Sequence, residues 1–147
     1  MNTVRTCIVD TCIIIDALAE REPFASAAQA LCLAVANDEI SGFIPAKSVA
    51  DIYYIMHRSL HSGSETRALL KKLFLSFGIL DTTALDCRNA LTSPISDFED
   101  AIIVETACRT GVDFIVTRNT KDFAHSTIPV ITAEELMNSP AVNQMGS

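Results

Sequence analysis

The sequence predicts one α/β domain built around a mostly parallel sheet that is covered on both faces. The chain has 147 residues and is 49% hydrophobic, which suits one packed core and leaves little room for a second. The candidate strands are short and apolar on both sides, and helical patterns separate them. This alternation is typical of parallel strands joined by helical crossovers. We expect the domain to span residues 1–138 and the tail, 139–147, to be frayed.

The first third of the chain is predicted to form a strand, two helices and a second strand. The β-leaning run at 4–9 predicts a strand that stops at Asp10, and a helical pattern follows through Leu18. An Ala-rich stretch with apolar residues at helical spacing predicts a helix at 24–36. A short apolar run predicts the second strand at 40–44, which Pro45 should close.

The middle of the chain contains two helical patterns, a brief strand and a third helix. Apolar residues at i, i+3, i+4 and i+7 predict a helix at 47–60, which a Ser-Gly-Ser segment at 62–64 should break. The next helix, 65–76, carries its apolar residues on one face. A strand at 78–80 and a helix at 83–91 follow.

The last third begins with a helix at 98–109, and Gly111 is well placed to end it. Phe114, Ile115 and Val116 predict a strand at 113–117. The remaining elements are a polar turn at 118–125, a strand at 128–131 and a helix at 133–137.

The net charge of −7 is unevenly distributed along the chain. Residues 91–147 carry −5, whereas residues 51–90 carry +1. An acidic total argues against loose, charge-driven binding of nucleic acid, because general nucleic-acid binders usually present a basic surface. The excess of acid fits better with a selective target, a basic protein partner, or both.

Composition also limits where the protein is expected to work. No apolar run approaches the roughly 20 residues of a membrane span, and no long apolar segment precedes Asp10 as in a secretory signal. The five cysteines are odd in number and scattered, without the spacing of a metal site. They predict buried free thiols in a protein of the reducing cytoplasm.

Acidic and amide side chains follow the candidate strands. They are Asp10 after the first strand, Asp51 in the helix after the second, Asp97 and Asp100 near the start of the helix at 98–109, and Asn119 and Asp122 in the turn after Thr117. Because parallel strands end at one edge of a sheet, these side chains could converge there. Clustered carboxylates repel one another unless a hard cation lies among them, and oxygen ligands alone favour Mg²⁺ or Mn²⁺. The pattern therefore predicts metal-assisted phosphodiester hydrolysis.

Each of these residues also has a purely structural interpretation. Asp10 could only cap the helix that follows it. Ser96 and Glu99 match a capping box, which would make Asp97 an acid of the first helical turn. Asp100 could lie at the edge of the core, and Asp51 could be a solvated helical residue. Asn119 and Asp122 are common turn residues.

Several segments resemble motifs of the PIN domain family. The run Cys7-Ile-Val-Asp-Thr-Cys resembles the opening strand and loop of the family, and residues 97–107 and 115–123 resemble its third and fourth acidic motifs. Residues 128–136 fit its last strand and helix. Within the family, the sequence is most similar to the small stand-alone VapC-like toxins.

The resemblance implies a three-layer α/β/α sandwich with a central, mostly parallel sheet of about five short strands. It also implies a ribonuclease that depends on Mg²⁺ or Mn²⁺. The implied catalytic residues are Asp10, Asp51, Asp100 and Asp122. The implied metal ligands are Asp10, Asp51, Asp97, Asp100, Asn119 and Asp122, with Thr11, Thr117, Arg118 and Lys121 as supporting or substrate-binding residues.

Two positions depart from the pattern of the family. Cys12 occupies a position where the family often has Asn, and a thiol is a poorer hydrogen-bonding group than an amide. Asn119 occupies a position where many relatives carry Asp, which would leave the site one charge weaker.

The leading hypothesis is an endoribonuclease that is the toxin of a toxin–antitoxin pair, with RNA, a protein antitoxin and a second copy of the chain as partners. Its RNA backbone contacts would come from Lys47, Arg58, Arg67, Lys71, Lys72, Arg118 and Lys121, although a solvated helix face explains most of these residues equally well.

The first alternative is a PIN-fold binding module with weak or no catalysis. A receiver domain or an aspartyl-phosphate hydrolase is disfavoured. The hydrolase pattern needs a second Asp at position 12, which is Cys, and a receiver needs a Lys after a late strand.

Overall fold

The computed structural model, which describes residues 4–139, contains every strand and helix that the sequence predicts. The strands are β1 (Thr6–Val9), β2 (Ser41–Pro45), β3 (Gly78–Leu80), β4 (Phe114–Val116) and β5 (Val130–Ile131). The helices are α1 (Thr11–Leu18), α2 (Ala25–Ala36), α3 (Ala46–Leu60), α4 (Gly63–Leu73), α5 (Ala84–Ala90), α6 (Phe98–Thr110) and α7 (Ala133–Met137). A short 3-10 helix (Thr120–Phe123) occupies the predicted polar turn. Apart from Ser139, the predicted tail lies outside the described residues.

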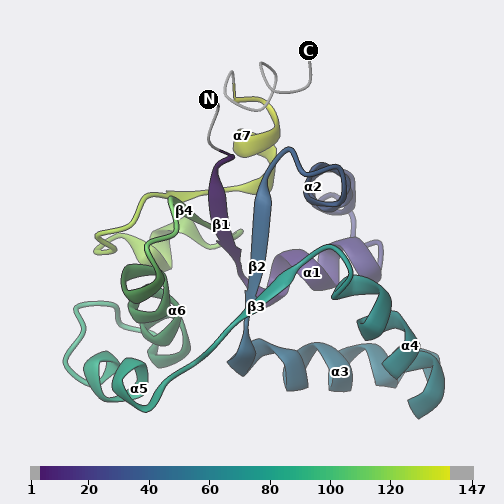
Figure 1. The fold of residues 1–147 in the computed structure, drawn as a ribbon, viewed down its shortest axis with the longest axis horizontal. Helices are drawn as coiled ribbons and strands as arrows, with labels where there is room; N and C mark the ends of the chain where they lie inside the picture. The colour runs from purple at the N-terminus through teal and green to yellow at the C-terminus, as the bar shows by residue number, and fades with distance from the viewer. Residues whose placement is uncertain (1–3, 140–147) are drawn as a thin grey trace.

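The five strands form one parallel sheet in the order β3-β2-β1-β4-β5. The chain builds outward from β1 to β2 and β3 on one side, and then returns to add β4 and β5 on the other. Crossovers between parallel strands are right-handed as a rule, so this reversal places the later helices on the opposite face of the sheet. In Figure 1, α1 to α4 accordingly lie on one side of the strands, and α5 and α6 lie on the other.

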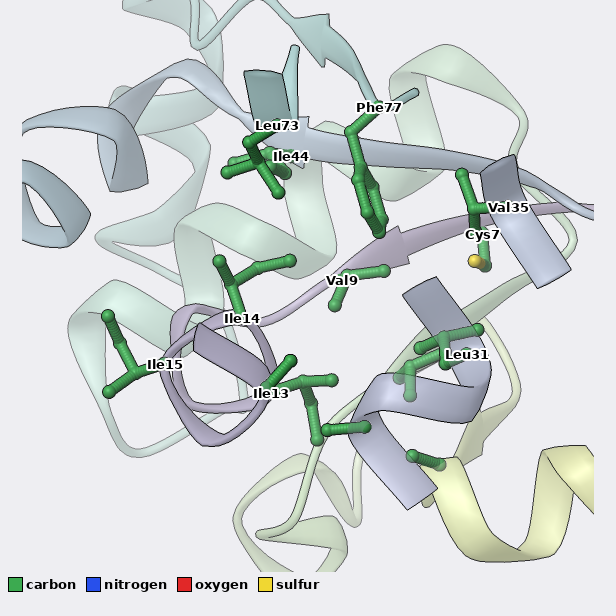
Figure 2. Packing of buried hydrophobic residues seen from close by; sticks show 14 of the residues in the cluster. Cys7, Val9, Ile13, Ile14, Ile15, Leu31, Val35, Ile44, Leu73 and Phe77 are labelled. Atoms are coloured by element: carbon green, nitrogen blue, oxygen red, sulfur yellow. The ribbon is translucent and has the colours of Figure 1, made fainter. Parts of the chain in front are cut away.

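The core is divided into two clusters by the sheet. Cys7 and Val9 belong to a cluster with α1 to α4 and α7, whereas Ile8 belongs to a second cluster with α5 and α6. Neighbouring residues of a strand point to opposite faces, which explains this alternation. Figure 2 shows Ile13 and Ile14 of α1 packed beside Val9 in the first cluster. The predicted three-layer α/β/α sandwich is therefore confirmed.

Three boundaries show how local chemistry modifies the sequence pattern. α4 begins at Gly63, inside the Ser-Gly-Ser segment that was expected to separate the two helices. Ser62 caps this helix, because its hydroxyl accepts the N–H of Glu65 at 3.2 Å. Gly111 has a φ of 73° and ends α6, as predicted. Pro45 is the last residue of β2 rather than a residue beyond it.

No helix of residues 4–139 has the length and apolarity to cross a bilayer.

Close packing between β2 and the helical layer depends on a residue without a side chain. A Cβ atom on Gly42 would lie 2.8 Å from Cγ2 of Val35 and 2.9 Å from Cε1 of Phe77. Both neighbours are buried in the first cluster and have little room to move. Gly42 is therefore a packing requirement of the strand.

A buried carboxylate joins the two helices on the other face. Asp86 of α5 is 2% exposed and accepts hydrogen bonds from Nε of Arg109 at 2.9 Å and from the hydroxyl of Thr106 at 3.2 Å, both on α6. It also accepts the backbone N–H of Thr83, completing a capping box at the start of α5. Burial alone raises the pKa of Asp86, but these hydrogen bonds outweigh it and hold the pKa below its usual value.

We expect Gly42→Ala to lower the free energy of unfolding by about 2 kcal/mol, because the added methyl group overpacks a filled site. Gly63→Ala is the matched control. A Cβ there meets only the Tyr53 hydroxyl at 3.3 Å, and Ala favours the helix. Urea unfolding measures both variants. Equal stability of Gly42→Ala and the native chain would contradict the packing argument.

We expect Asp86→Asn to cost about 2 kcal/mol at neutral pH, because it removes the ionised partner of Arg109. The folded-state pKa of Asp86 lies below its unfolded value of about 4, so its carboxylate stabilises the fold above that pH. The stability difference between the two proteins should therefore shrink as the pH falls below about 4. Urea unfolding at a series of pH values measures it, and a difference that persists unchanged into acid would argue against this account.

Candidate active site

The candidate site lies where the chain reverses its direction across the sheet. β1 and β4 are neighbours there, and Val9 pairs with Val116 in the parallel register. The next residue of each strand, Asp10 and Thr117, therefore emerges at the same edge of the sheet. In open α/β sheets this point, beyond the carboxyl ends of the strands, is where ligands usually bind.

Asp10 is held in place by two hydrogen bonds. Its Oδ1 accepts the backbone N–H of Thr11 at 2.8 Å, and its Oδ2 accepts the hydroxyl of Thr117 at 2.8 Å. Asp10 is also the N-cap of α1, so the structural interpretation of this residue is correct as far as it goes. Capping and a role at the edge of the sheet are compatible, because the second oxygen reaches across to β4.

Thr117 organises the loop that follows β4. Its side chain is fully buried, and its hydroxyl accepts the backbone N–H of Asn119 at 3.2 Å while donating to Asp10. The Sγ of Cys12 lies 3.7 Å from Oδ2 of Asp10 and 4.0 Å from the Thr117 hydroxyl. Burial, followed by the charge of Asp10, raises the pKa of the Cys12 thiol, so it remains protonated and can act as a weak donor.

A surface pocket of about 380 Å³ brings several predicted residues together. Asp10, Thr11, Asp51 and Asp100 all line it. The other lining residues are Lys47, Tyr54, Ile55, Arg58 and Glu99. The pocket thus collects side chains from the end of β1 and from α1, α3 and α6.

Asp100 shows the strongest electrostatic effect at the site. Burial, together with the charges of Asp10, Asp97 and Asp122, raises the pKa of Asp100 to about 7, and Lys47 opposes this change. The effect shows that the three other carboxylates lie within electrostatic range of Asp100. Asp97 and Asp122 themselves are exposed and do not line the pocket.

The capping box predicted from Ser96 and Glu99 is wrong. Asp97 is the N-cap of α6, and its Oδ1 accepts the backbone N–H of Asp100 at 3.0 Å. A carboxylate directly at the cap can reach the free N–H groups of the first turn, so it replaces Ser96 in this role. The cap positions Asp100 at the start of α6.

Several other predicted residues do not line this pocket. Asn119 is exposed and its side chain does not cap the 3-10 helix; its backbone carbonyl accepts the N–H of Asp122 at 2.9 Å. Lys121 is exposed on the same segment and has no ion pair within residues 4–139. Three of the predicted contacts to the RNA backbone, Arg67, Lys71 and Lys72, lie on α4 and do not line this pocket.

Arg118 points to a buried acid that the sequence analysis did not single out. Its Nε lies 2.9 Å from Oδ2 of Asp16, and its guanidinium carbon lies 4.3 Å from the ring centroid of Phe24. Asp16 is fully buried on α1, and burial raises its pKa while Arg118 and Arg21 oppose this. A charged residue after three consecutive isoleucines was the available signal, because a lone acid in an apolar helix must be paired.

The oxygen atoms that line the pocket suit a hard divalent cation, although the side chains that carry them are not gathered tightly around one point. Within residues 4–139, no three carboxylate, thiol or imidazole side chains are close enough to form a ready metal site. The donors at the pocket are nevertheless carboxylate and hydroxyl oxygens, and the buried Thr11 hydroxyl has no hydrogen-bond partner among the described residues. Asp10, Asp51 and Asp100 are the residues of the pocket that could bind such an ion.

Comparison with solved structures supports the same fold. A toxin–antitoxin complex from Klebsiella pneumoniae is 26% identical, with a TM-score of 0.63 over 86% of this chain and 97% of that chain. FitAcB from Neisseria gonorrhoeae is 18% identical, with a TM-score of 0.64 over 87% and 98%. VapBC2 from Rickettsia felis, bound to a DNA fragment from its promoter, is 16% identical, with a TM-score of 0.59 over 86% and 98%.

Comparison with curated proteins gave no match. The model of the PIN domain family, in contrast, matches residues 6–121. This segment runs from the first residue of β1 into the 3-10 helix and includes every predicted site residue except Asp122. The chain therefore belongs to the PIN domain family.

Proposed function

We propose that this PIN domain is a divalent-metal-dependent endoribonuclease that hydrolyses RNA phosphodiester bonds. The observation that carries the proposal is the shared pocket at the switch point, which Asp10, Asp51 and Asp100 line from three different parts of the chain. Membership of the PIN family and the resemblance to toxin–antitoxin structures support it. The metal is Mg²⁺ or Mn²⁺, because the donors are oxygen atoms.

The chain contributes binding and orientation to this reaction. When bound, a divalent ion activates water and offsets the charge that develops on the phosphate. Asp10 would hold the ion with little rearrangement, since Thr11 and Thr117 already fix its carboxylate. Asp100 and Asp51 would complete the ligand set. Lys47, whose side chain is 15% exposed, lies beside these acids and would contact the phosphate.

We further propose that the protein is the toxin of a toxin–antitoxin pair and works in the cytoplasm as a homodimer. The K. pneumoniae structure is a toxin–antitoxin complex and supports a protein antitoxin as the partner. The net charge of −7 would favour a basic segment on that partner.

Asp10→Asn should reduce RNA cleavage by at least about 100-fold, because the neutral amide is a poor metal ligand. The fold should persist, since the amide oxygen of the new side chain can still accept the N–H of Thr11, and its NH2 group can donate to the hydroxyl of Thr117. Asp38→Asn is the control: it removes the same charge from an exposed turn with φ of 60°, which Asn tolerates. Cleavage of total RNA with Mg²⁺ or Mn²⁺ measures the effect. Equal activity of Asp10→Asn and the native protein would refute the assignment.

Millimolar Mn²⁺ should raise the melting temperature of the native protein. At about 100 times the Kd, binding to the folded state alone stabilises it by about 2.7 kcal/mol. Asp10→Asn should lose most of this shift, whereas Asp38→Asn should keep it. Differential scanning fluorimetry with and without Mn²⁺ measures all three proteins. The absence of any shift in the native protein would favour the alternative, a PIN module without catalysis.

A further inference from the structure

The wall of the pocket formed by α3 carries two cations and an aromatic ring on one helical face. Lys47, Asp51, Tyr54 and Arg58 are separated by four, three and four residues, and all four line the pocket. Such spacing aligns side chains along one side of a helix. The Cα atoms of Lys47 and Arg58 are about 16 Å apart along the helix axis, with Tyr54 between them.

Tyr54 is an exposed aromatic residue that borders the pocket. Its surface is 63% exposed, although it borders the pocket of Asp10 and Asp100. One edge of the side chain is supported, because the rings of Tyr53 and Tyr54 meet at 89° with centroids 5.0 Å apart. Tyr53 in turn stacks on His57 at 5.7 Å. A ring that is supported from one side and otherwise exposed is a ready surface for stacking.

The charged residues that line the pocket are compatible with a ligand that carries several phosphate groups. Four acids line the pocket, Asp10, Asp51, Glu99 and Asp100, against the two cations Lys47 and Arg58. A divalent cation among the acids would bring the sum of these charges to zero. Lys47 lies 3.9 Å from the largely exposed carboxylate of Glu99, a weak pair that a phosphate oxygen can replace. Arg58 is exposed and has no ion pair within residues 4–139.

We propose that Tyr54 is the base-stacking, specificity-determining residue of this site, and that it selects an unpaired nucleotide of RNA next to the cleaved bond. This inference rests on the proposed ribonuclease function. A base stacks on the Tyr54 ring, while Lys47 and Arg58 contact phosphates on either side. Bases within a duplex are already stacked on both faces, and only unpaired bases are free to stack on a protein ring.

The test compares the binding of short RNA strands that carry 2-aminopurine, whose fluorescence falls when it stacks. Binding is measured with Ca²⁺ in place of Mg²⁺, with the chain that retains Asp10 as the background, and a denaturing gel verifies that the RNA stays intact. Adding Tyr54→Ala should weaken binding of the single strand about tenfold and abolish the quenching, because stacking of one base contributes an effect of this size. Tyr54→Phe should retain both properties. Binding of the same strand within a duplex should be weaker than that of the single strand for the background and for Tyr54→Phe, and this preference should largely disappear in Tyr54→Ala.

Leu33→Ala is the control, because Leu33 is also 63% exposed but lies on α2 and does not line this pocket. It should bind the single strand as the background does. Tyr54→Ala should melt within about 2 °C of the background, since the ring is on the surface. Unchanged binding and quenching by Tyr54→Ala would overturn the proposal.

Two further outcomes separate this inference from its alternatives. If Tyr54→Ala converts a dimer to a monomer in sedimentation while leaving quenching intact, Tyr54 is a contact between two copies of the chain, and the proposal is wrong.

Cleavage by the protein with native Asp10 tests the ribonuclease function separately. Cleavage that does not depend on Tyr54 overturns only the present inference, whereas quenching that depends on Tyr54 without cleavage overturns only the proposed enzyme.

Discussion

The hydrogen bond from Thr117 to Asp10 is the interaction on which the candidate site depends. It exists because β1 and β4 are adjacent and because Val9 is paired with Val116. A slip of one residue in this pairing would turn the following side chains to the opposite face of the sheet. The strand pairing and the packing of the core therefore determine the fold and, in addition, the position and orientation of the Asp10 carboxylate. The elements involved are the buried strand β1, its two parallel neighbours and the two core clusters.

The site also shows how the fold tolerates crowded negative charge. Asp100 lies among Asp10, Asp97 and Asp122, and its raised pKa records both its partial burial and their repulsion. Lys47 lies close enough to offset part of that repulsion, and the N-cap bond from the backbone of Asp100 to Asp97 uses some of the charge to stabilise α6. The acidic total of the chain therefore overstates the negative charge that is spread over the rest of its surface. Much of the charge in the last third of the chain lies around one site.

The fold was predictable because its signals are local, whereas much of the site was not. Short apolar runs and helical spacing located the strands and helices, and the placement of acids after strands identified Asp10, Asp51 and Asp100, which share a pocket. Contacts between distant segments left no such pattern. Thr117 could be placed at the end of a strand but not opposite Asp10, and Arg118 pairs with Asp16 through tertiary packing.

Two misjudged or missed residues make the same point. Ser96 matched a capping pattern that the neighbouring Asp97 satisfies instead, because a single residue of difference in the helix start decides the cap. Tyr54 resembled any other aromatic residue of an amphipathic helix until its exposure beside the acids was known. Which side of a helix faces a pocket depends on the partners of that helix.

The sequence distance between the two ends of the central hydrogen bond affects when the site can exist. Asp10 and Thr117 are 107 residues apart. At typical synthesis rates, roughly 5–20 s pass between the addition of the first residue and the addition of the second. During that interval the growing chain has β1 and its neighbour β2 but not β4, so the carboxylate lacks its hydroxyl partner. Translation itself therefore delays assembly of the pocket until most of the domain has been made.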